Sequence, residues 1–505
     1  MLLNSDPGDS RPLWLIPEGD LPRWLNEQPA ETAAWVRANG FQGERHRVLT
    51  LPAADGGIAG AVVGLGPLRS VADLKLWHAA GLPDRLPALT YRLAHGSSDR
   101  AASEGTPSGG EGIPNGDGLA TPSQAAKPLP ADAATHFVLG WLMGSYRMSR
   151  YRAPTSTSSP PGIPSLATRS RPALVAPPEA DLVYAHTAAE ATAFARDLIN
   201  TPANDLGPAE LAAAAVELAG RFGARCEVLT GEELKARDFP LIHAVGAASP
   251  REPRLIDLRW GDRQAPRVTL VGKGVCFDTG GLDIKPSAGM LLMKKDMGGA
   301  ACALAVAQML MRLAAPVQLR VLIPAVENSI GGRAYRPSDV LRSRKGLTVE
   351  IGNTDAEGRL ILADALVEAD SERPDLLIDL ATLTGAARVA LGPELPAAYA
   401  TEETLLTELR ARGEEEADPV WPMPLWSGYD DELASKIADL GNVSAAPFAG
   451  SIIAALFLKR FISATSHWLH LDLYAWNPRE RPGRPVGAEA QCVRSVYRLI
   501  RSRFG

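Results

Sequence analysis

From about Glu179 to the C-terminus, short apolar runs typical of strands alternate with longer runs typical of helices. This alternation predicts βαβ units, and therefore an α/β fold whose central sheet is mostly parallel and flanked by helices. Sheets of this kind bind ligands outside the carboxyl ends of their strands, so we expect the chemistry there. The expected helices are 186–199, 210–222, 298–315 and 359–370, and the expected strands are 226–229, 267–271, 317–323, 347–351 and 376–380.

The chain before this region predicts a second, smaller α/β domain. Residues 48–51 and 58–65 have the pattern of two strands joined by a Gly-containing turn. Residues 71–78 and 136–152 have the apolar spacing of helices. Strands and helices of this size are enough for a small domain with its own sheet.

Two stretches of this N-terminal part have the composition of loops. Residues 96–134 are rich in Gly, Ser, Pro and Ala and almost lack large apolar side chains, so we expect a disordered insertion. Residues 153–178 are rich in Ser, Thr and Pro, which is typical of a linker. The sequence therefore predicts an N-terminal α/β domain at 1–178 and a catalytic domain at 179–505.

Composition narrows the class of protein. The 505 residues include 52 basic and 58 acidic side chains, a net charge of −6, whereas proteins that mainly coat nucleic acid carry a basic excess. The four cysteines form no CxxC pair, the apolar run 451–458 ends at Lys459, and no secretory signal is visible at the N-terminus. We therefore expect a cytoplasmic protein with reduced thiols, no membrane contact and no main role on nucleic acid.

Carboxylates and glycines gather in segments that follow predicted strands. Asp278 comes shortly after the strand that ends at Val271, Asp296 follows in the next segment, and Asp355 and Glu357 come just after the strand that ends at Ile351. Four negative charges brought together would repel one another, and two divalent cations would neutralise them. The segments contain no histidine, and carboxylate ligands suit Mn²⁺ or Mg²⁺, although Zn²⁺ also accepts them.

A plainer interpretation competes with the metal site. Read singly, any of these aspartates is better explained as a helix cap or a turn former, and Lys273 as a solvated loop lysine. The clustering of so many charged residues with glycine at two strand ends favours the metal site over that interpretation.

The eight residues NTDAEGRL, at 353–360, resemble the signature of the leucyl aminopeptidase family, cytosolic dinuclear metallopeptidases. The resemblance spans essentially all of 179–505, whereas the N-terminal part is similar only in outline. The other segments that carry it are RDLINTPAN at 196–204, KGVCFDTGG at 273–281, Lys285, MKKDMGG at 293–299, ATLTG at 381–385 and WLHLD at 468–472.

The resemblance implies two divalent metal ions, Mn²⁺ or Zn²⁺, held by five side chains. Asp278 and Glu357 match the carboxylates that contact both metals. Lys273 and Asp296 match the remaining ligands of the tighter metal, and Asp355 matches the ligand of the more exchangeable one. A lysine ligates a metal only as the neutral amine, so Lys273 would need a strongly lowered pKa, which an adjacent dication supplies.

The resemblance also assigns the catalytic pair and a substrate pocket. Lys285 and Arg359 match the catalytic residues that are not ligands. Met293, Thr382 and Gly385 match positions that line the pocket for the first substrate side chain, and Leu383 offers its backbone nearby. Packing at a strand end is a strong alternative explanation for Met293 and Thr382.

These assignments imply an aminopeptidase that favours leucine and other apolar N-terminal residues. Two metals can share one hydroxide nucleophile, polarise the scissile carbonyl and hold the free α-amine of a peptide, while Lys285 stabilises the oxyanion. The segments offer no histidine as base, and the resemblance gives the one spare carboxylate, Asp283, no role. Arg359 stays protonated, but its planar fork can hold bicarbonate as a proton shuttle, as the resemblance implies.

Two alternatives for the function stay open, as does the assembly. The same fold could serve a DNA-binding or regulatory role, against which the net charge of −6 argues. The enzyme could also act on cysteinyl-glycine. The resemblance further implies a homo-oligomer, commonly a homohexamer.

Overall fold

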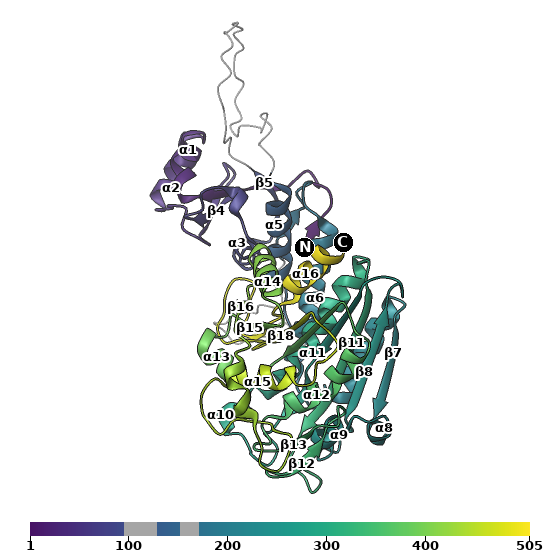
Figure 1. The fold of residues 1–505 in the computed structure, drawn as a ribbon. Coiled ribbons are helices and arrows are strands. Elements are labelled where there is room, and N and C mark those ends of the chain that lie inside the picture. Colours follow the sequence, from purple (N-terminus) through teal and green to yellow (C-terminus); the bar gives the residue numbers. More distant parts are fainter. Residues whose placement is uncertain (95–128, 152–170) are drawn as a thin grey trace, which may run out of the picture. The chain divides into compact units, whose positions relative to one another are not determined.

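The computed structural model describes residues 1–94, 129–151 and 171–505, drawn in colour in Figure 1. The chain divides into two compact units, one of residues 1–186 with 481–483 and the other of residues 187–480 with 484–505. The boundary falls inside one helix, eight residues beyond the sequence-based boundary at 178/179. Within the described ranges, no helix is both long enough and apolar enough to cross a membrane.

The first unit is built on a six-stranded sheet with the strand order β1-β6-β5-β2-β4-β3. Every pair in it is parallel except β3 with β4 at the edge. Phe137 and Trp141 of α5 are fully buried against the sheet residues Leu13, Val63 and Leu174. The strands are β1 (Leu2–Leu3), β2 (Arg11–Pro17), β3 (Val48–Pro52), β4 (Ile58–Gly66), β5 (Thr90–Ala94) and β6 (Ala173–Val175), and the helices are α1 (Leu21–Asn26), α2 (Ala30–Ala38), α3 (Leu76–Ala79), α4 (Leu82–Arg85) and α5 (Ala131–Gly144).

The C-terminal ends of both predicted loop stretches form regular structure. Of the expected insertion, 96–128 lie outside the described residues, but 131–134 form the first turn of α5. Of the expected linker, 153–170 also lie outside, but Ala173–Val175 is strand β6. Small residues were misleading because they pack well in a core: Ala133 and Ala134 are 1% and 0% exposed.

Two other N-terminal helices differ from expectation. The helix expected over 71–78 is two short turns, Val71–Asp73 and α3, because Leu74 and Lys75 between them are extended. The helix expected over 136–152 ends at Gly144.

The second unit contains a nine-stranded sheet whose centre is parallel, as the sequence predicts. Its order is β16-β15-β18-β14-β9-β11-β8-β7, and β10 pairs with β11 in parallel. The neighbours β18, β14, β9 and β11 run parallel, and antiparallel pairs lie toward the edges. The strands are β7 (Arg225–Thr230), β8 (Arg254–Trp260), β9 (Arg267–Gly272), β10 (Gly274–Asp278), β11 (Gln318–Asn328), β14 (Leu376–Ala381), β15 (Ala397–Ala400), β16 (Trp421–Pro422) and β18 (Trp468–Asp472).

Helices cover the central strands. Both α11 and α12 contact β9, β11 and β14, and these strands are buried along nearly their whole length. This explains their continuous apolar sequences. The helices of this part are α6 (Leu182–Asn200), α7 (Pro208–Arg221), α8 (Glu232–Ala236), α9 (Pro240–Gly246), α10 (Ser287–Met290), α11 (Gly298–Arg312), α12 (Glu357–Ser371), α13 (Gly385–Leu391), α14 (Glu403–Glu415), α15 (Gly450–Lys459) and α16 (Val493–Phe504), with 3-10 turns η3 (Met293–Met297) and η4 (Ser427–Leu433).

The strand expected over 347–351 is present but does not belong to the central sheet. As β13 (Thr348–Glu350) it pairs with β12 (Val340–Arg342) and β17 (Leu440–Gly441) in a separate three-stranded sheet. A two-stranded sheet of β19 (Trp476–Asn477) and β20 (Gly487–Ala488) completes the set. An apolar run in the sequence indicates a buried strand, but it does not indicate to which sheet that strand belongs.

Glycines bring α11 unusually close to the central sheet. A Cβ on Gly299, in the first turn of α11, would lie 2.0 Å from the carbonyl oxygen of Leu380 in β14. A Cβ on Gly272, the last residue of β9, would lie 2.6 Å from Cα of Ala300. This close approach fixes where η3, which immediately precedes α11, meets the carboxyl ends of β9 and β14.

We expect Gly299→Ala to destabilise the protein by roughly 1–3 kcal/mol, because the added methyl group would force α11 away from β14. Urea unfolding followed by circular dichroism measures the effect. Gly220→Ala is the matched control, since Gly220 is an exposed helical glycine of α7 with no atom within 4 Å of its Cβ position. That change should be neutral or stabilising by up to about 1 kcal/mol. Equal unfolding midpoints for the two variants would contradict the proposed packing constraint.

Candidate metal centre

The side chains expected to bind metal come from four neighbouring places in the second unit. Lys273 lies between β9 and β10, and Asp278 is the last residue of β10. Asp296 lies in η3, Asp355 precedes α12, and Glu357 is the first residue of that helix. Asp278 therefore ends a strand of the nine-stranded sheet, whereas Asp355 and Glu357 follow a strand of the small sheet.

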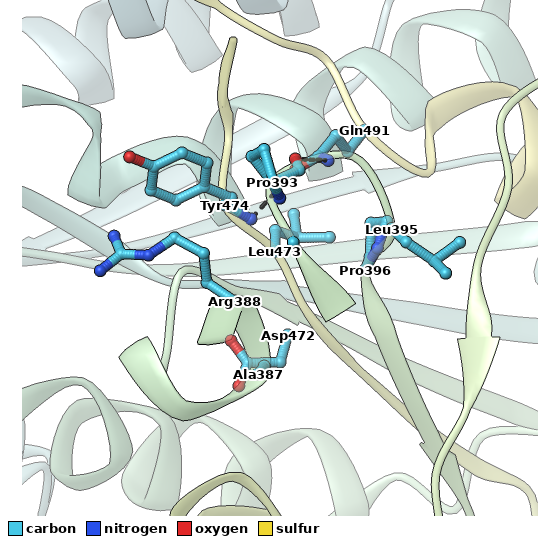
Figure 2. Close-up of a pocket in the computed structure, with 10 residues that line it drawn as sticks. Ala387, Arg388, Pro393, Leu395, Pro396, Asp472, Leu473, Tyr474 and Gln491 are labelled. Atoms are coloured by element: carbon cyan, nitrogen blue, oxygen red, sulfur yellow. Dashed lines mark hydrogen bonds between the residues drawn. The ribbon is translucent and has the colours of Figure 1, made fainter. Parts of the chain in front are cut away.

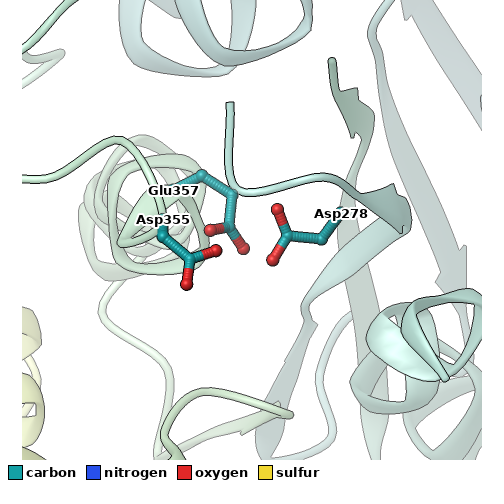
Figure 3. A group of neighbouring side chains, drawn as sticks. All are labelled: Asp278, Asp355 and Glu357. Atoms are coloured by element: carbon teal, nitrogen blue, oxygen red, sulfur yellow. The ribbon is translucent and has the colours of Figure 1, made fainter. Parts of the chain in front are cut away.

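Three of the carboxylates converge. Figure 3 shows Asp278, Asp355 and Glu357 facing one another, and ligand oxygens from all three lie within 4.8 Å of one another. Asp278 and Glu357 are only 2% and 1% exposed. Burial and the nearby Asp278 raise the pKa of Glu357 to about 8 and that of Asp355 to about 6. The cluster therefore disfavours its own ionisation, and a bound cation would relieve that penalty.

Lys273 connects this cluster to Asp296. Its Nζ lies 2.8 Å from Oδ2 of Asp296 and 3.0 Å from Oε1 of Glu357, and it donates to the carbonyl oxygen of Thr382 at 2.9 Å. Burial opposes the charge of Lys273, but Asp296 and Glu357 outweigh it and hold the pKa above its usual value. Gly358 makes room for this amine, because a Cβ there would lie 2.5 Å from Cε of Lys273.

Lys285 lies on the other side of the carboxylates. Its Nζ is 2.8 Å from Oδ2 of Asp278 and also contacts Asp355. Burial alone would lower the pKa of Lys285, but Asp278 and the hydrogen bond to Asp355 raise it above its usual value. Lys285 is therefore a cation beside the cluster that makes no bond to Asp296.

Asp283 is occupied in joining the two motif segments. Its Oδ2 accepts the backbone N–H of Thr354 at 2.7 Å and the hydroxyl of Thr354 at 3.1 Å, while its own N–H donates to that hydroxyl. The Thr354 hydroxyl also reaches the carbonyl oxygen of Gly280 at 2.6 Å. Since Thr354 directly precedes Asp355, this clamp positions Asp355 against Asp278.

Two residues that sequence reasoning missed complete the clamp. Asn328 Nδ2 donates to Oδ1 of Asp278 at 2.9 Å and to the carbonyl oxygen of Thr354 at 3.1 Å. The hydroxyl of Tyr335 donates to the same carbonyl at 2.7 Å. Both lie outside the motif segments, so their role could be found only once the contacts were known.

Two of the residues expected to line the substrate pocket, Met293 and Thr382, lie next to Asp296. Met293 opens η3 and is half-buried. The Thr382 hydroxyl donates to Oδ1 of Asp296 at 2.8 Å, so this threonine positions a candidate ligand. Gly385 is exposed and begins α13. The N–H of Leu383 is occupied by Oδ1 of Asp472 at 3.0 Å, a carboxylate that sequence reasoning did not single out.

Arg359 lies in the first turn of α12, close to Glu357. Burial lowers its pKa to about 10, which leaves it a cation at neutral pH. Its Nη1 donates to the carbonyl oxygen of Asn442, and its buried Nε has no hydrogen-bond partner in the part of the chain that the structure describes. The guanidinium therefore keeps donor capacity for a small anion.

Models of two protein domains match this chain. Residues 193–497 match the catalytic domain of the cytosol aminopeptidase family, and residues 11–106 match the M17 aminopeptidase N-terminal domain. A probable cytosol aminopeptidase of Geobacter sulfurreducens is 39% identical over 75% of this chain and 76% of its own length. A probable cytosol aminopeptidase of Mycobacterium tuberculosis is 40% identical over 74% of each chain.

Solved structures of related enzymes are similar to this chain over nearly its whole length. The cytosol aminopeptidase of Coxiella burnetii is 40% identical, with a TM-score of 0.86 over 100% of this chain and 99% of that one. The bottromycin maturation enzyme BotP in complex with Mn is 34% identical, with a TM-score of 0.80 over 98% of this chain and 100% of that one.

A carboxylate cluster with two lysines, at the end of a mostly parallel sheet, defines an α/β metallohydrolase of the leucyl aminopeptidase type. The chain belongs to the cytosol aminopeptidase family. The resemblance seen in the sequence and the predicted two-domain α/β fold are thereby confirmed.

We expect Asp283→Ala to weaken divalent-metal binding by roughly 10- to 100-fold, as is typical when a residue that orients a ligand is lost. Calorimetric titration of the metal-free protein with Mn²⁺ measures the effect. Asp439→Ala is the matched control, because Oδ2 of Asp439 makes the same pair of bonds, to the N–H and hydroxyl of Thr348, at 2.7 and 2.8 Å. Equal Mn²⁺ affinities in the two variants would show that the clamp does not position Asp355.

Proposed function

We propose that this metal-dependent aminopeptidase uses two divalent ions to remove N-terminal residues from peptides, with leucine and other apolar residues favoured. The observation that carries the proposal is the convergence of Asp278, Asp355 and Glu357 around two lysine amines. Lys273, Asp278, Asp296, Asp355 and Glu357 would hold the ions, which would supply Lewis-acid activation of the peptide carbonyl and of water.

The donor set supports Mn²⁺ as the first choice of metal. The proposed ligands are four carboxylates and one amine, without histidine, and carboxylate oxygen suits Mn²⁺. The related BotP was solved in complex with Mn, which agrees with this choice. Zn²⁺ is the alternative, because it accepts carboxylate and nitrogen ligands alike.

Two side chains of the site have separate tasks. Lys273 would act as a ligand through its neutral amine. Asp296 and Glu357 hold this amine charged in the structure, so Lys273 would lose its proton as a dication takes over those carboxylates. Lys285 contacts Asp278 and Asp355. It would therefore lie close to a peptide carbonyl bound by a metal at those carboxylates, and it could donate to the carbonyl oxygen as that oxygen becomes negative.

Arg359 is proposed to bind bicarbonate. The carboxylates near it are committed to lysines or to the clamp at Thr354, so the site's own side chains offer no free base. Bicarbonate would supply a proton acceptor, and the unpartnered Nε of Arg359 is a donor that could hold it.

The exposure of side chains and the names of the relatives support proposals on substrate preference, assembly and location. The half-buried Met293 and the partly buried Leu383 favour an apolar first side chain. We propose a homohexamer from the family resemblance, and the exposed apolar side chains Leu291, Val389 and Phe448 are surface that association would cover. The relatives' name, cytosol aminopeptidase, supports a cytoplasmic location.

We expect a chelator to lower the rate on leucine amides by at least about 100-fold, because the buried carboxylates cannot activate a carbonyl themselves. Added Mn²⁺, Zn²⁺ or Co²⁺ should restore the rate. Asp355→Ala should lose mainly one of two bound ions, whereas Asp278→Ala or Glu357→Ala should impair both, as measured by elemental analysis. Full activity in a preparation without bound metal would contradict the proposal.

We expect Arg359→Ala to lower turnover by roughly 10²–10⁴-fold, the usual effect of losing a general base, with both metals retained. Added bicarbonate should raise the rate of the parent enzyme and have little effect on the variant. Near-normal turnover of the variant in bicarbonate-depleted buffer would rule out this role for Arg359.

A further inference from the structure

Lys295 is a buried cation that the proposed mechanism does not use. It lies in η3 between Met293 and Asp296, and only 5% of the residue is exposed. It makes no hydrogen bond and no ion pair within the described residues. Its neighbour Lys294, by contrast, donates to the carbonyl oxygen of Asn200 at 2.6 Å. A buried amine without a hydrogen-bonding partner is costly, and an anion from outside the chain would lower that cost.

The acids near Lys295 are committed to other groups. Asp296 is bound by Lys273 and by the Thr382 hydroxyl. Asp472 accepts the backbone N–H groups of 383 and 384, at 3.0 and 3.1 Å, and the hydroxyls of 384 and 451, at 2.6 and 3.1 Å. Neither carboxylate therefore neutralises Lys295 directly.

A second cation lies against the same aromatic ring. The Nζ of Lys295 is 4.8 Å from the ring centroid of Tyr474, and Cζ of Arg388 is 4.9 Å from that centroid. Figure 2 shows Arg388 and Tyr474 side by side at the edge of a hollow also lined by Gln491. Two positive charges packed against one ring repel each other, and an anion bound beside them would lower that repulsion.

This cluster adjoins the proposed pocket for the first substrate side chain. Lys295 shares η3 with Met293, and Arg388 lies one turn after Gly385 in α13. A Cβ on Gly298 would lie 2.3 Å from Cβ of Ala475 and 3.3 Å from Cγ2 of Thr382. The segment that carries Tyr474 therefore passes directly beside Thr382.

We propose that Lys295 and Arg388, gathered on Tyr474, form a positive wall of the pocket for the N-terminal side chain. Among substrates with a charged first residue, the enzyme then favours Glu or Asp over Lys or Arg. A substrate carboxylate gives Lys295 the partner that it lacks, whereas a substrate cation meets two like charges in a poorly solvated place. The inference rests on the proposed function for the position of the pocket.

The test compares kcat/KM of the metal-loaded protein on aminoacyl amides of Glu and Lys. We expect a Glu/Lys ratio above 1 in the parent and a ratio lower by roughly 10- to 100-fold in Lys295→Met, which keeps the length of the side chain but removes the charge. Arg388→Gln should lower the ratio in the same direction. The ratio is insensitive to losses of folded protein or of metal, because these affect both substrates equally.

Lys294→Met is the control, because it removes an adjacent positive charge that already has a backbone partner; its ratio should match the parent's. A parent ratio of 1 or less, or a ratio unchanged in Lys295→Met, would overturn the inference. Calorimetric binding of free L-glutamate and L-lysine makes the same comparison without turnover, and equal affinities would overturn it too. If the metal-loaded parent enzyme does not hydrolyse leucine amide, that result would instead contradict the proposed function.

Discussion

Repulsion among buried carboxylates is the constraint on which the centre depends. Asp278, Asp296 and Glu357 are each at most 3% exposed, so water cannot screen their charges. Lys273 compensates two of them, and Lys285 compensates Asp278 together with the more exposed Asp355. The lysines and the proposed dications have the same electrostatic effect, because both place positive charge next to the negative charge of buried carboxylates.

Near these charges, several glycines lie so close to neighbouring atoms that a larger residue would not fit. Gly358 leaves space for the Lys273 side chain, and Gly299 lets α11 sit against β14. Gly280, at φ +90°, turns the chain after Asp278 and donates its N–H to that carboxylate at 2.9 Å. At each of these glycines a methyl group would collide with the site or, at Gly299, with the strand against which α11 packs.

Much of the fold and the site could be predicted from the sequence, and the misses have physical causes. Strands β9 and β14 are buried on both faces, so their apolar runs are unambiguous. The pairing of Thr354 with Asp283 joins residues 71 positions apart, which spacing cannot reveal. The free amine of Lys295 is equally hidden, since a lysine between Lys294 and Asp296 looks solvated until its burial is known.

The proposed ligands come from two sheets, and this has a consequence for exchange. Asp278 ends a strand of the nine-stranded sheet, whereas Asp355 follows β13 of the three-stranded sheet. The bonds around Thr354 and the contact with Lys285 join Asp355 to the first sheet. Small sheets can open locally without unfolding a larger neighbour. If the segment that carries Asp355 opens locally, the lifetime of a bound ion would follow the frequency of that opening rather than the stability of the whole enzyme.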